Sequence, residues 1–252
     1  MAAAPQVTVS IVSHGQAALV RKLVANLHAV SAHNISRLVI TLNIAESDML
    51  EDLPALFPCI GIERIVNPVR KGFGANHNQA FRRFETPWFL VLNPDMHFDT
   101  DVLAPLTAKA DARSGLLAPR IYEPGKTSPE QHRATITPQE IIMRRRPGYA
   151  IPAVPQWIPG LFMLFRSQAY RQVDGFDERF FMYGEDFDIC ARVQLAGWKL
   201  QIGEDLSALH DARRASHASP QYLYWHVMSL LRIWGSRVFW RFQNQNQSHH
   251  KS

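Results

Sequence analysis

The most distinctive segment of this chain runs from position 176 to 188 and reads Phe-Asp-Glu-Arg-Phe-Phe-Met-Tyr-Gly-Glu-Asp-Phe-Asp. Carboxylates are costly to place beside aromatic surface unless they are paired, hydrated or used. A carboxylate in such a pocket can act as a general base or hold a metal. Acidic residues in a first helical turn often only complement the helix dipole, and that suffices for Glu185 and Asp188. It does not explain the aromatic surroundings of Asp186, so this residue is the first candidate for chemistry.

A second acidic candidate follows the apolar residues 90–92, in the sequence Asn93-Pro94-Asp95. A carboxylate at the end of a strand could bind Mg²⁺ or Mn²⁺, which prefer oxygen ligands and commonly bridge substrate phosphates. The alternative is a loop cap, because Asn, Pro and Asp all favour turns. His210 ends another short apolar stretch, and by itself it is more typical of a structural histidine than of a metal ligand.

A third motif, Arg-Lys-Gly-Phe-Gly-Ala-Asn-His-Asn at 70–78, is a glycine-containing turn that enters a helix. Backbone N–H groups at a helix start, with Arg70 and Lys71 beside them, form a site for an anionic diphosphate. The spacing is neither that of a P-loop nor that of a dinucleotide fingerprint. A capped helix without a ligand is the alternative.

The elements that must position these residues alternate between strand-like and helix-like segments. We expect strands at 7–13, 37–43, 62–66 and 88–92, and helices at 16–30 and 73–84. This alternation predicts βαβ units and a parallel sheet. Ligands bind beyond the carboxyl ends of the strands in such sheets, and His14, Asn43, Asn67 and Asp95 all fall at those ends.

The second half of the chain is less periodic. Residues 122–159 are rich in proline and contain the arginines at 144–146, which indicates a long loop or lid over a site. A helix at 185–196 and a strand at 198–202 are expected next. The segment 222–242 mixes aromatic residues with arginines, as suits a helix at a membrane interface. The alternative is a helix that packs its aromatic residues on the domain.

Composition limits the class of protein. The chain has 252 residues, a net charge of +5 and two cysteines, Cys59 and Cys190, which lack Cys-x-x-Cys spacing. We expect a globular protein of a reducing compartment. The segment before the first strand is too short for a signal peptide, and no apolar run is long enough to span a bilayer. The positive charge admits nucleic acid, an anionic membrane or a phosphate-bearing substrate as partner.

In chain order, the strand at 7–13, the turn at 67–78, Asn93-Pro94-Asp95, the segment 175–188 and His210 together resemble family 2 glycosyltransferases of the GT-A fold. The bacterial rhamnosyltransferase-like branch is the most similar, and the resemblance covers roughly residues 6–240. It implies an α/β fold with a Rossmann-like nucleotide-sugar-binding sheet and flanking helices. The domain would span 1–217, with a donor half at about 6–120 and an acceptor half at about 121–217. A C-terminal amphipathic helix and polar tail would occupy 218–252.

The resemblance implies inverting transfer of a sugar from a nucleoside diphosphate. Asp186 would be the general base, and Asp95 and His210 would bind Mg²⁺ or Mn²⁺. The donor-binding residues would be His14, Asn43, Asn67, Arg70, Lys71, Gly72, Asn76, Asn78, Asn93 and Asp95, and the acceptor-binding residues Trp157, Gly160 and Glu185.

Two positions depart from the family pattern. Asn93 stands where the family has the first acid of its Asp-x-Asp element, which lowers metal affinity on charge grounds. Leu42-Asn43 stands where many members have Asp-Asn, whose Asp holds the nucleoside. The nucleoside is therefore left open between thymidine and uridine.

The expected role is a step in bacterial surface polysaccharide synthesis, such as that of O-antigen. Rhamnose is the first expected sugar, from a dTDP-linked donor, and galactose or another hexose from a UDP-linked donor is the next. The acceptor would be a saccharide, possibly carried on a polyprenyl diphosphate. The enzyme would be cytoplasmic and peripheral at the inner face of the cell membrane.

Two other classes of protein were weighed. A catalytically silent nucleotide- or sugar-binding protein could share the fold, but binding alone does not require both Asp95 and Asp186. A nucleic-acid-binding protein would suit the positive charge. It would leave the carboxylate-rich aromatic segment unexplained, so we expect no nucleic acid partner.

Overall fold

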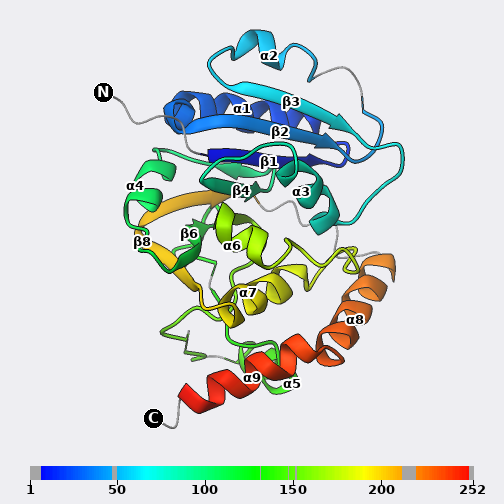
Figure 1. The fold of residues 1–252 in the computed structure, drawn as a ribbon, viewed down its shortest axis with the longest axis vertical. Coiled ribbons are helices and arrows are strands. Elements are labelled where there is room, and N and C mark those ends of the chain that lie inside the picture. The colour runs from blue at the N-terminus through cyan, green and yellow to red at the C-terminus, as the bar shows by residue number, and fades with distance from the viewer. Residues whose placement is uncertain are drawn as a thin grey trace.

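The structure is a computed structural model that describes residues 7–46, 50–130, 132–146, 148–150, 152–211 and 220–249. Its centre is an eight-stranded sheet in the order β3-β2-β1-β4-β7-β6-β8-β5, drawn in Figure 1. The strands are β1 (Val7–Ser13), β2 (Ile35–Leu42), β3 (Gly61–Val66), β4 (Trp88–Leu92), β5 (Met96–His97), β6 (Ser114–Tyr122), β7 (Phe162–Arg166) and β8 (Lys199–His210). The helices are α1 (Ala17–Ser31), a 3-10 turn (Ala32–Asn34), α2 (Leu53–Leu56), α3 (Phe73–Phe81), α4 (Leu103–Ala108), α5 (Pro138–Met143), α6 (Ser167–Gln172), α7 (Glu185–Leu195), α8 (Pro220–Trp234) and α9 (Arg237–His249).

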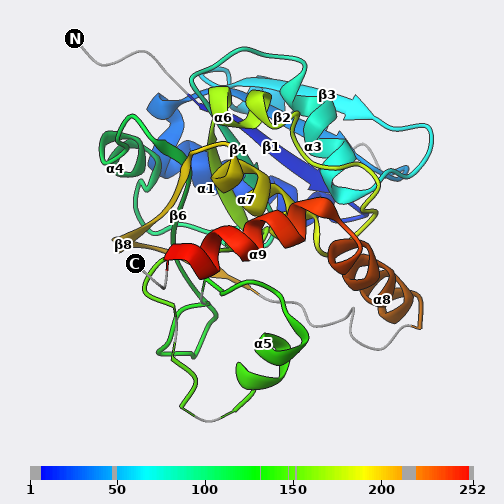
Figure 2. The ribbon, with the colours of Figure 1, turned by 60° about the horizontal axis from the view of Figure 1, so that its bottom comes forward.

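Strand β1 lies at the centre of the first half, and every one of its residues is buried. It pairs in parallel with both β2 and β4, and β2 pairs in parallel with β3. Its β-branched residues suit a strand that is covered on both faces. Figure 2 shows α1 behind this sheet and α3, α6 and α7 in front of it. The predicted parallel βαβ arrangement is therefore confirmed for β1 to β4.

The second half of the sheet mixes parallel and antiparallel pairs. Strand β7 runs antiparallel to both β4 and β6, whereas β6 and β8 are parallel. Hydrophobic periodicity reports which segments are buried, but it carries no information about strand direction. The strand expected at 198–202 continues to His210, where the last residues pair with β5.

The proline-rich segment is mostly irregular, as predicted, but it contains the short helix α5. The helix begins after Thr137, whose hydroxyl accepts a hydrogen bond of 3.0 Å from the backbone N–H of Glu140. Pro138 occupies the first helical position, where a missing N–H costs nothing. The sequence Thr-Pro-Gln-Glu is a helix-start signature that the sequence analysis missed.

The single C-terminal helix expected at 222–242 is two helices, separated at Gly235 and Ser236. In α9, Phe239 and Phe242 are buried and their rings lie 6.1 and 6.2 Å from that of Phe187 in α7. Helix α8 extends away along the side of the molecule (Figure 1). None of the helices in the described ranges combines the length and the hydropathy needed to cross a bilayer.

Candidate active site

The predicted site residues of the first half lie at one edge of the sheet. His14, Asn43 and Asn67 directly follow β1, β2 and β3, and Asp95 lies three residues beyond β4. The backbone N–H of Asn43 donates to Ser13, and that of Asn67 donates to Leu42, each at 3.0 Å. These bonds extend the parallel ladder past the strand ends, so the side chains are held by the sheet itself.

Three of the predicted asparagines form a buried amide network. Oδ1 of Asn43 accepts from the backbone N–H of Lys71 and from Nδ2 of Asn67, both at 2.9 Å, and Nδ2 of Asn43 donates to the Lys71 carbonyl at 2.8 Å. Asn67 also donates to Asn76 at 2.6 Å, and Asn76 donates to the carbonyl of Gly72 at 2.9 Å. These hydrogen bonds hold the loop at 70–72 in place. Because the amides bond to one another and to this loop, the loop is the part of this region that can face a ligand.

The loop at 70–72 packs against the acidic and aromatic segment. A Cβ atom on Gly72 would lie 2.8 Å from the carbonyl oxygen of Phe181, so only glycine fits there. The guanidinium of Arg70 lies 5.7 Å from the ring centre of Phe181 and 5.6 Å from that of Trp225 in α8. Arg70 in this loop therefore contacts both the acidic segment and α8.

Asn78 connects helix α3 to the same segment. Its Nδ2 donates to the carbonyl of Phe176 at 2.9 Å, and its Oδ1 accepts from the backbone N–H of Phe176 at 2.9 Å and from the Tyr170 hydroxyl at 2.6 Å. With both amide atoms occupied, Asn78 acts as a clamp between the two halves of the site. The imidazole of His14 lies near Asn43, and burial followed by the charge of Arg70 lowers its pKa.

Asp95 and His210 form a pair. Nε2 of His210 lies 3.2 Å from Oδ2 of Asp95, and the backbone N–H of Asp211 donates to the Asp95 carbonyl at 2.9 Å. Burial alone would lower the pKa of His210, but the hydrogen bond and charge of Asp95 outweigh it and the pKa is raised. Asn93 is partly buried, and its backbone N–H donates to the Leu161 carbonyl at 3.0 Å.

The pair fits part of a divalent metal site. Oδ1 of Asp95 is buried and has no hydrogen-bond partner in the described part of the chain, so one carboxylate oxygen is left for a cation. Carboxylate and imidazole are both ligands that Mn²⁺ accepts. Within those residues no third His, Cys, Asp or Glu joins the pair to complete a site. Oxygen atoms of a bound diphosphate would have to supply the remaining ligands.

Asp186 lies in the first turn of α7, after Gly184, whose φ of 82° lets the chain turn into the helix. Its Oδ2 accepts a hydrogen bond of 3.2 Å from the backbone N–H of Gly160. Its Oδ1 accepts a hydrogen bond of 2.8 Å from the backbone N–H of Phe187, whose ring centre lies 6.0 Å from that of Trp157. Burial raises the pKa of Asp186 and outweighs the lowering effect of the Phe187 hydrogen bond. The structure thus brings Trp157 and Gly160, both predicted acceptor-binding residues, to the predicted base.

Glu185 lies beside Asp186 but is buried, with 6% of its surface exposed. Burial, and then repulsion from Asp186, raises the pKa of Glu185 to about 8. Its Oε2 is buried and has no hydrogen-bond partner among the described residues. Burial therefore favours the protonated form of Glu185.

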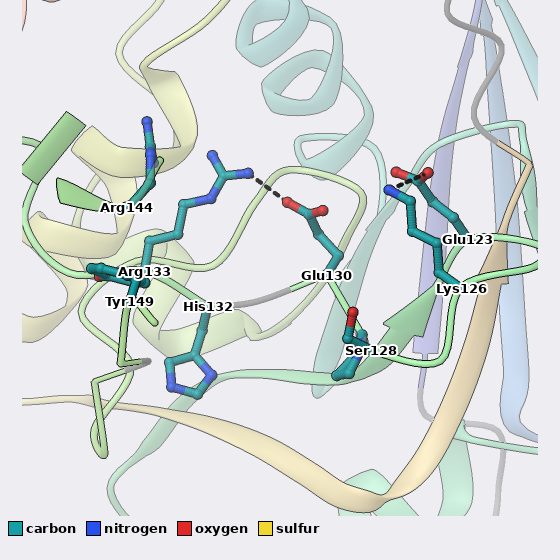
Figure 3. A pocket seen from close by; sticks show the side chains of 9 residues that line it. Glu123, Lys126, Ser128, Glu130, His132, Arg133, Arg144 and Tyr149 are labelled. Carbon is teal, nitrogen blue, oxygen red and sulfur yellow. Dashed lines mark hydrogen bonds and ion pairs between the residues drawn. The ribbon is translucent and has the colours of Figure 1, made fainter. Parts of the chain in front are cut away.

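A cavity of about 270 Å³ opens beside this site, between the strand end at Glu123 and the loop around α5, as Figure 3 shows. Arg133 and Arg144 line it and both lie on the ring of Trp157. The arginine cluster 144–146 was noted from the sequence, but Arg133 was not. A single arginine in an aperiodic segment does not form a recognisable sequence motif. Arg133 is brought to the site by an antiparallel β-bridge to Trp157.

Known proteins resemble this chain in sequence and in fold. A family model described as glycosyl transferase family group 2 matches residues 88–237, more than half of the chain. The chain is 28% identical to rhamnosyltransferase WbbL of Escherichia coli K12 over 248 residues, which covers 90% of this chain and 91% of that protein. It is 26% identical over 180 residues to an N-acetylglucosaminyl-diphospho-decaprenol L-rhamnosyltransferase of Mycobacterium tuberculosis, which covers 64% of this chain and 59% of that protein.

Two solved structures show the same architecture at low sequence identity. The mannosyltransferase PcManGT from Pyrobaculum calidifontis, in complex with GDP-Man and Mn²⁺, has a TM-score of 0.65 and 15% identity over 91% of this chain and 65% of its own. GalNAc-T7 with UDP, GalNAc and Mn²⁺ has a TM-score of 0.71 and 16% identity over 93% of this chain and 49% of its own. At this identity the likeness concerns the fold alone, and the expected GT-A architecture is confirmed.

Proposed function

Because the chain belongs to glycosyl transferase family group 2, we propose that it transfers a sugar from a nucleoside diphosphate to an acceptor hydroxyl with inversion at the anomeric carbon. The observation that carries this proposal is the position of Asp186. Its carboxylate accepts hydrogen bonds from the backbone N–H groups of Gly160 and Phe187, in the first turn of α7.

Asp186 is proposed as the general base. It would take the proton of the acceptor hydroxyl as the oxygen attacks the anomeric carbon from the face opposite the departing diphosphate. Burial raises the pKa of Asp186, which brings this carboxylate closer to the basicity that the task needs. Burial favours the protonated form of Glu185 beside it, and the Gly160 N–H holds one carboxylate oxygen in place.

Asp95 and His210 are proposed as the protein ligands of Mg²⁺ or Mn²⁺. A bound metal would act as a Lewis acid that neutralises charge on the departing nucleoside diphosphate. The free Oδ1 of Asp95 supports this assignment. Arg70, Lys71 and the turn at Gly72 are proposed to lie beside the same diphosphate. Asn43, Asn67, Asn76 and Asn78 would contribute by holding that loop and its neighbours, with His14 and Asn93 at the rim of the donor site.

We infer the donor from the relatives. One relative, which this chain matches over nearly its whole length, is named a rhamnosyltransferase. We therefore propose dTDP-rhamnose as the first donor to test. A UDP-linked galactose or another hexose is the second. The proposed role is a step in the synthesis of a bacterial surface polysaccharide such as O-antigen.

The proposed acceptor is a saccharide on a polyprenyl diphosphate. A second relative is named for an N-acetylglucosaminyl-diphospho-decaprenol acceptor, which is a lipid of this class. Helix α8 supports the proposal because Leu223, Tyr224, Val227, Met228 and Leu231 on it are exposed. Such a face suits the boundary between lipid headgroups and acyl chains. The enzyme would thus work at the cytoplasmic face of the membrane, where the helix meets the lipid carrier.

The experiment that tests this function is a transfer assay with purified protein and Mn²⁺. Thymidine, uridine and guanosine diphosphate sugars are each offered with a short-chain N-acetylglucosaminyl-diphospho-lipid. We expect a glycosylated product with donors of one nucleoside class. The one-bond carbon–proton coupling constant at the new linkage should show that the configuration of the anomeric carbon is inverted. Retention of configuration, or nucleotide binding without transfer by any donor, would contradict it.

A further inference from the structure

The side chains of two arginines, Arg133 and Arg144, lie over the ring of Trp157. The guanidinium carbon of Arg133 lies 4.8 Å from the ring centre, and that of Arg144 lies 5.8 Å from it. Trp157 itself is buried, with 5% of its surface exposed. Cation–π contacts of this kind stabilise each arginine singly. They do not remove the repulsion between the two positive charges that share one ring.

The carboxylates in the cavity do not neutralise this pair. Glu130 forms an ion pair with Arg133, and Glu123 forms one with Lys126 at 2.6 Å. Arg144 forms no ion pair with any residue that the structure describes, although it is half-buried. Burial, and then repulsion from Arg133, lowers the pKa of Arg144, yet a guanidinium remains charged at neutral pH. The charge of Glu140 acts in the opposite direction, but Glu140 forms no ion pair with Arg144 in the described residues. A half-buried cation that lacks an ion-paired carboxylate favours binding of an anion.

Arg144 is held in place before any ligand arrives. It directly follows α5, whose first turn is capped by Thr137. The hydroxyl of Tyr149 donates to the carboxylate of Glu140 in the same helix, which ties the loop after Arg144 back to α5. In Figure 3, Arg144, Arg133 and Tyr149 gather at one end of the cavity, away from Glu123 and Lys126. The cavity end next to Trp157 is therefore a preorganised cationic surface.

This cationic end adjoins the base. Arg133 lies on the ring of Trp157, and the centre of that ring is 6.0 Å from the ring centre of Phe187, the residue after Asp186. Gly160, three residues after Trp157, donates its backbone N–H to the Asp186 carboxylate at 3.2 Å. An acceptor whose diphosphate lies on the arginines would therefore present its sugar to Asp186.

We propose that Arg133 and Arg144 form the subsite that binds the diphosphate of the acceptor. The inference rests on the proposed function, because it assumes that the anion belongs to a glycosyl acceptor. It assigns a role to residues that the family resemblance did not single out.

Binding of inorganic pyrophosphate tests the subsite without requiring any transfer. Titration calorimetry is done on the full chain in EDTA, so that a metal-bound mode does not contribute. Arg144→Gln is expected to weaken pyrophosphate binding by about 10- to 100-fold, as one charged hydrogen bond is lost. Arg146→Gln is the matched control, because Arg146 is exposed and does not line the cavity. Equal affinity in Arg144→Gln and the wild type would overturn the proposal.

Kinetics with two acceptors then identify the source of the anion. One acceptor carries the diphosphate, and the other is a neutral alkyl glycoside of the same sugar. Arg144→Gln should raise KM for the diphosphate acceptor about tenfold or more, leave KM for the donor unchanged, and have little effect with the neutral acceptor. An equal effect on both acceptors, or a rise in the donor KM instead, would contradict the subsite.

A folding defect and a failure of the proposed function are both distinguishable from a failure of the subsite. Melting temperatures of the variants report on folding, and Arg144→Lys, which keeps the charge but not the planar fork, should recover part of the pyrophosphate affinity. If the wild type transfers no sugar but binds pyrophosphate through Arg144, the anion site stands and the proposed function fails. If the wild type transfers sugar and Arg144→Gln behaves as the wild type does in both assays, the subsite alone fails.

Discussion

Nε2 of His210 lies 3.2 Å from Oδ2 of Asp95, although 115 residues separate the two in the chain. The pairing of β5 with β8 produces this contact, because Met96 is opposite His210 in the antiparallel ladder. The sheet therefore fixes the distance between the two groups, and each orients the other. One oxygen of Asp95 remains without a partner in the described residues, which is the feature that makes the pair a candidate metal site.

Replacing Asp95 tests the metal assignment. Asp95→Asn should raise the Mn²⁺ concentration needed for half-maximal transfer by at least about tenfold, since a neutral amide is a poorer ligand than a carboxylate. Transfer rate against Mn²⁺ concentration measures the effect. Asp99→Asn is the control, because this nearby carboxylate is exposed. Superimposable metal titrations for Asp95→Asn and the wild type would remove Asp95 from the site.

Asn43 provides a test of the buried amide network. Asn43→Asp replaces an N–H donor with an oxygen that faces the Lys71 carbonyl at 2.8 Å. We expect the variant to lose about 1–3 kcal/mol of stability, because a buried acceptor is left opposite another acceptor. The donor KM should rise as the 70–72 loop shifts. A variant with unchanged unfolding free energy and tighter donor binding would show that the network is not needed.

Glu185 gives a pH-dependent prediction. Its pKa is raised to about 8 in the folded protein by burial and then by Asp186, whereas an unfolded Glu titrates near 4.5. The folded state therefore binds more protons than the unfolded state between these two values, and the wild type loses stability as pH rises through this range. Glu185→Gln has no such proton to lose, so its stability relative to the wild type should increase from about pH 5 to pH 8 and then level off.

Melting temperatures of the wild type and Glu185→Gln, measured across that range, check the prediction. The difference in unfolding free energy at the upper end should be at most ~5 kcal/mol, the equivalent of the full pKa shift. Melting curves whose separation stays constant with pH would mean that Glu185 is already ionised in the folded protein.

Helix α8 is predicted to bind an anionic membrane through its exposed apolar face. Leu231→Glu places a charge on that face, where 55% of the leucine is exposed. Co-sedimentation with phosphatidylglycerol-containing vesicles should fall by roughly tenfold or more, because apolar burial is lost and an anion faces anionic lipid. Gln245→Glu on the exposed surface of α9 adds the same charge and should have a smaller effect. Equal vesicle binding by both variants would argue against α8 as the contact.

Much of this fold could be predicted because its strongest signals are local. The strand at 7–13 is a run of β-branched and apolar residues, and the structure has β1 at the same bounds. The helix expected at 16–30 differs from α1 by one residue at each end. The direction of β7 and the break between α8 and α9 could not be predicted in the same way. Strand direction depends on pairing with distant segments, and the break depends on how Phe239 and Phe242 reach the core.

The candidate site was predictable only in part. Asp186, Trp157 and Gly160 were expected at the acceptor side, and the structure brings the three together. The predicted donor residues Asn43, Asn67 and Asn76 lie at the expected edge, but their amides are bonded to one another and to the loop. A sequence shows that a polar residue follows a strand, but it does not show whether that residue faces a ligand or the protein.

The rate of sugar transfer by Asp186→Asn tests the central claim most directly. The amide keeps the size of the carboxylate but cannot accept the proton, so turnover should fall by roughly 10²–10⁴-fold while donor binding is retained. Asp177→Asn is the matched control in the same acidic segment, since Arg179 already pairs with that carboxylate at 2.6 Å, and it should transfer sugar at nearly the wild-type rate. Near-normal turnover in Asp186→Asn would contradict the account, because it would show that this carboxylate is not the base.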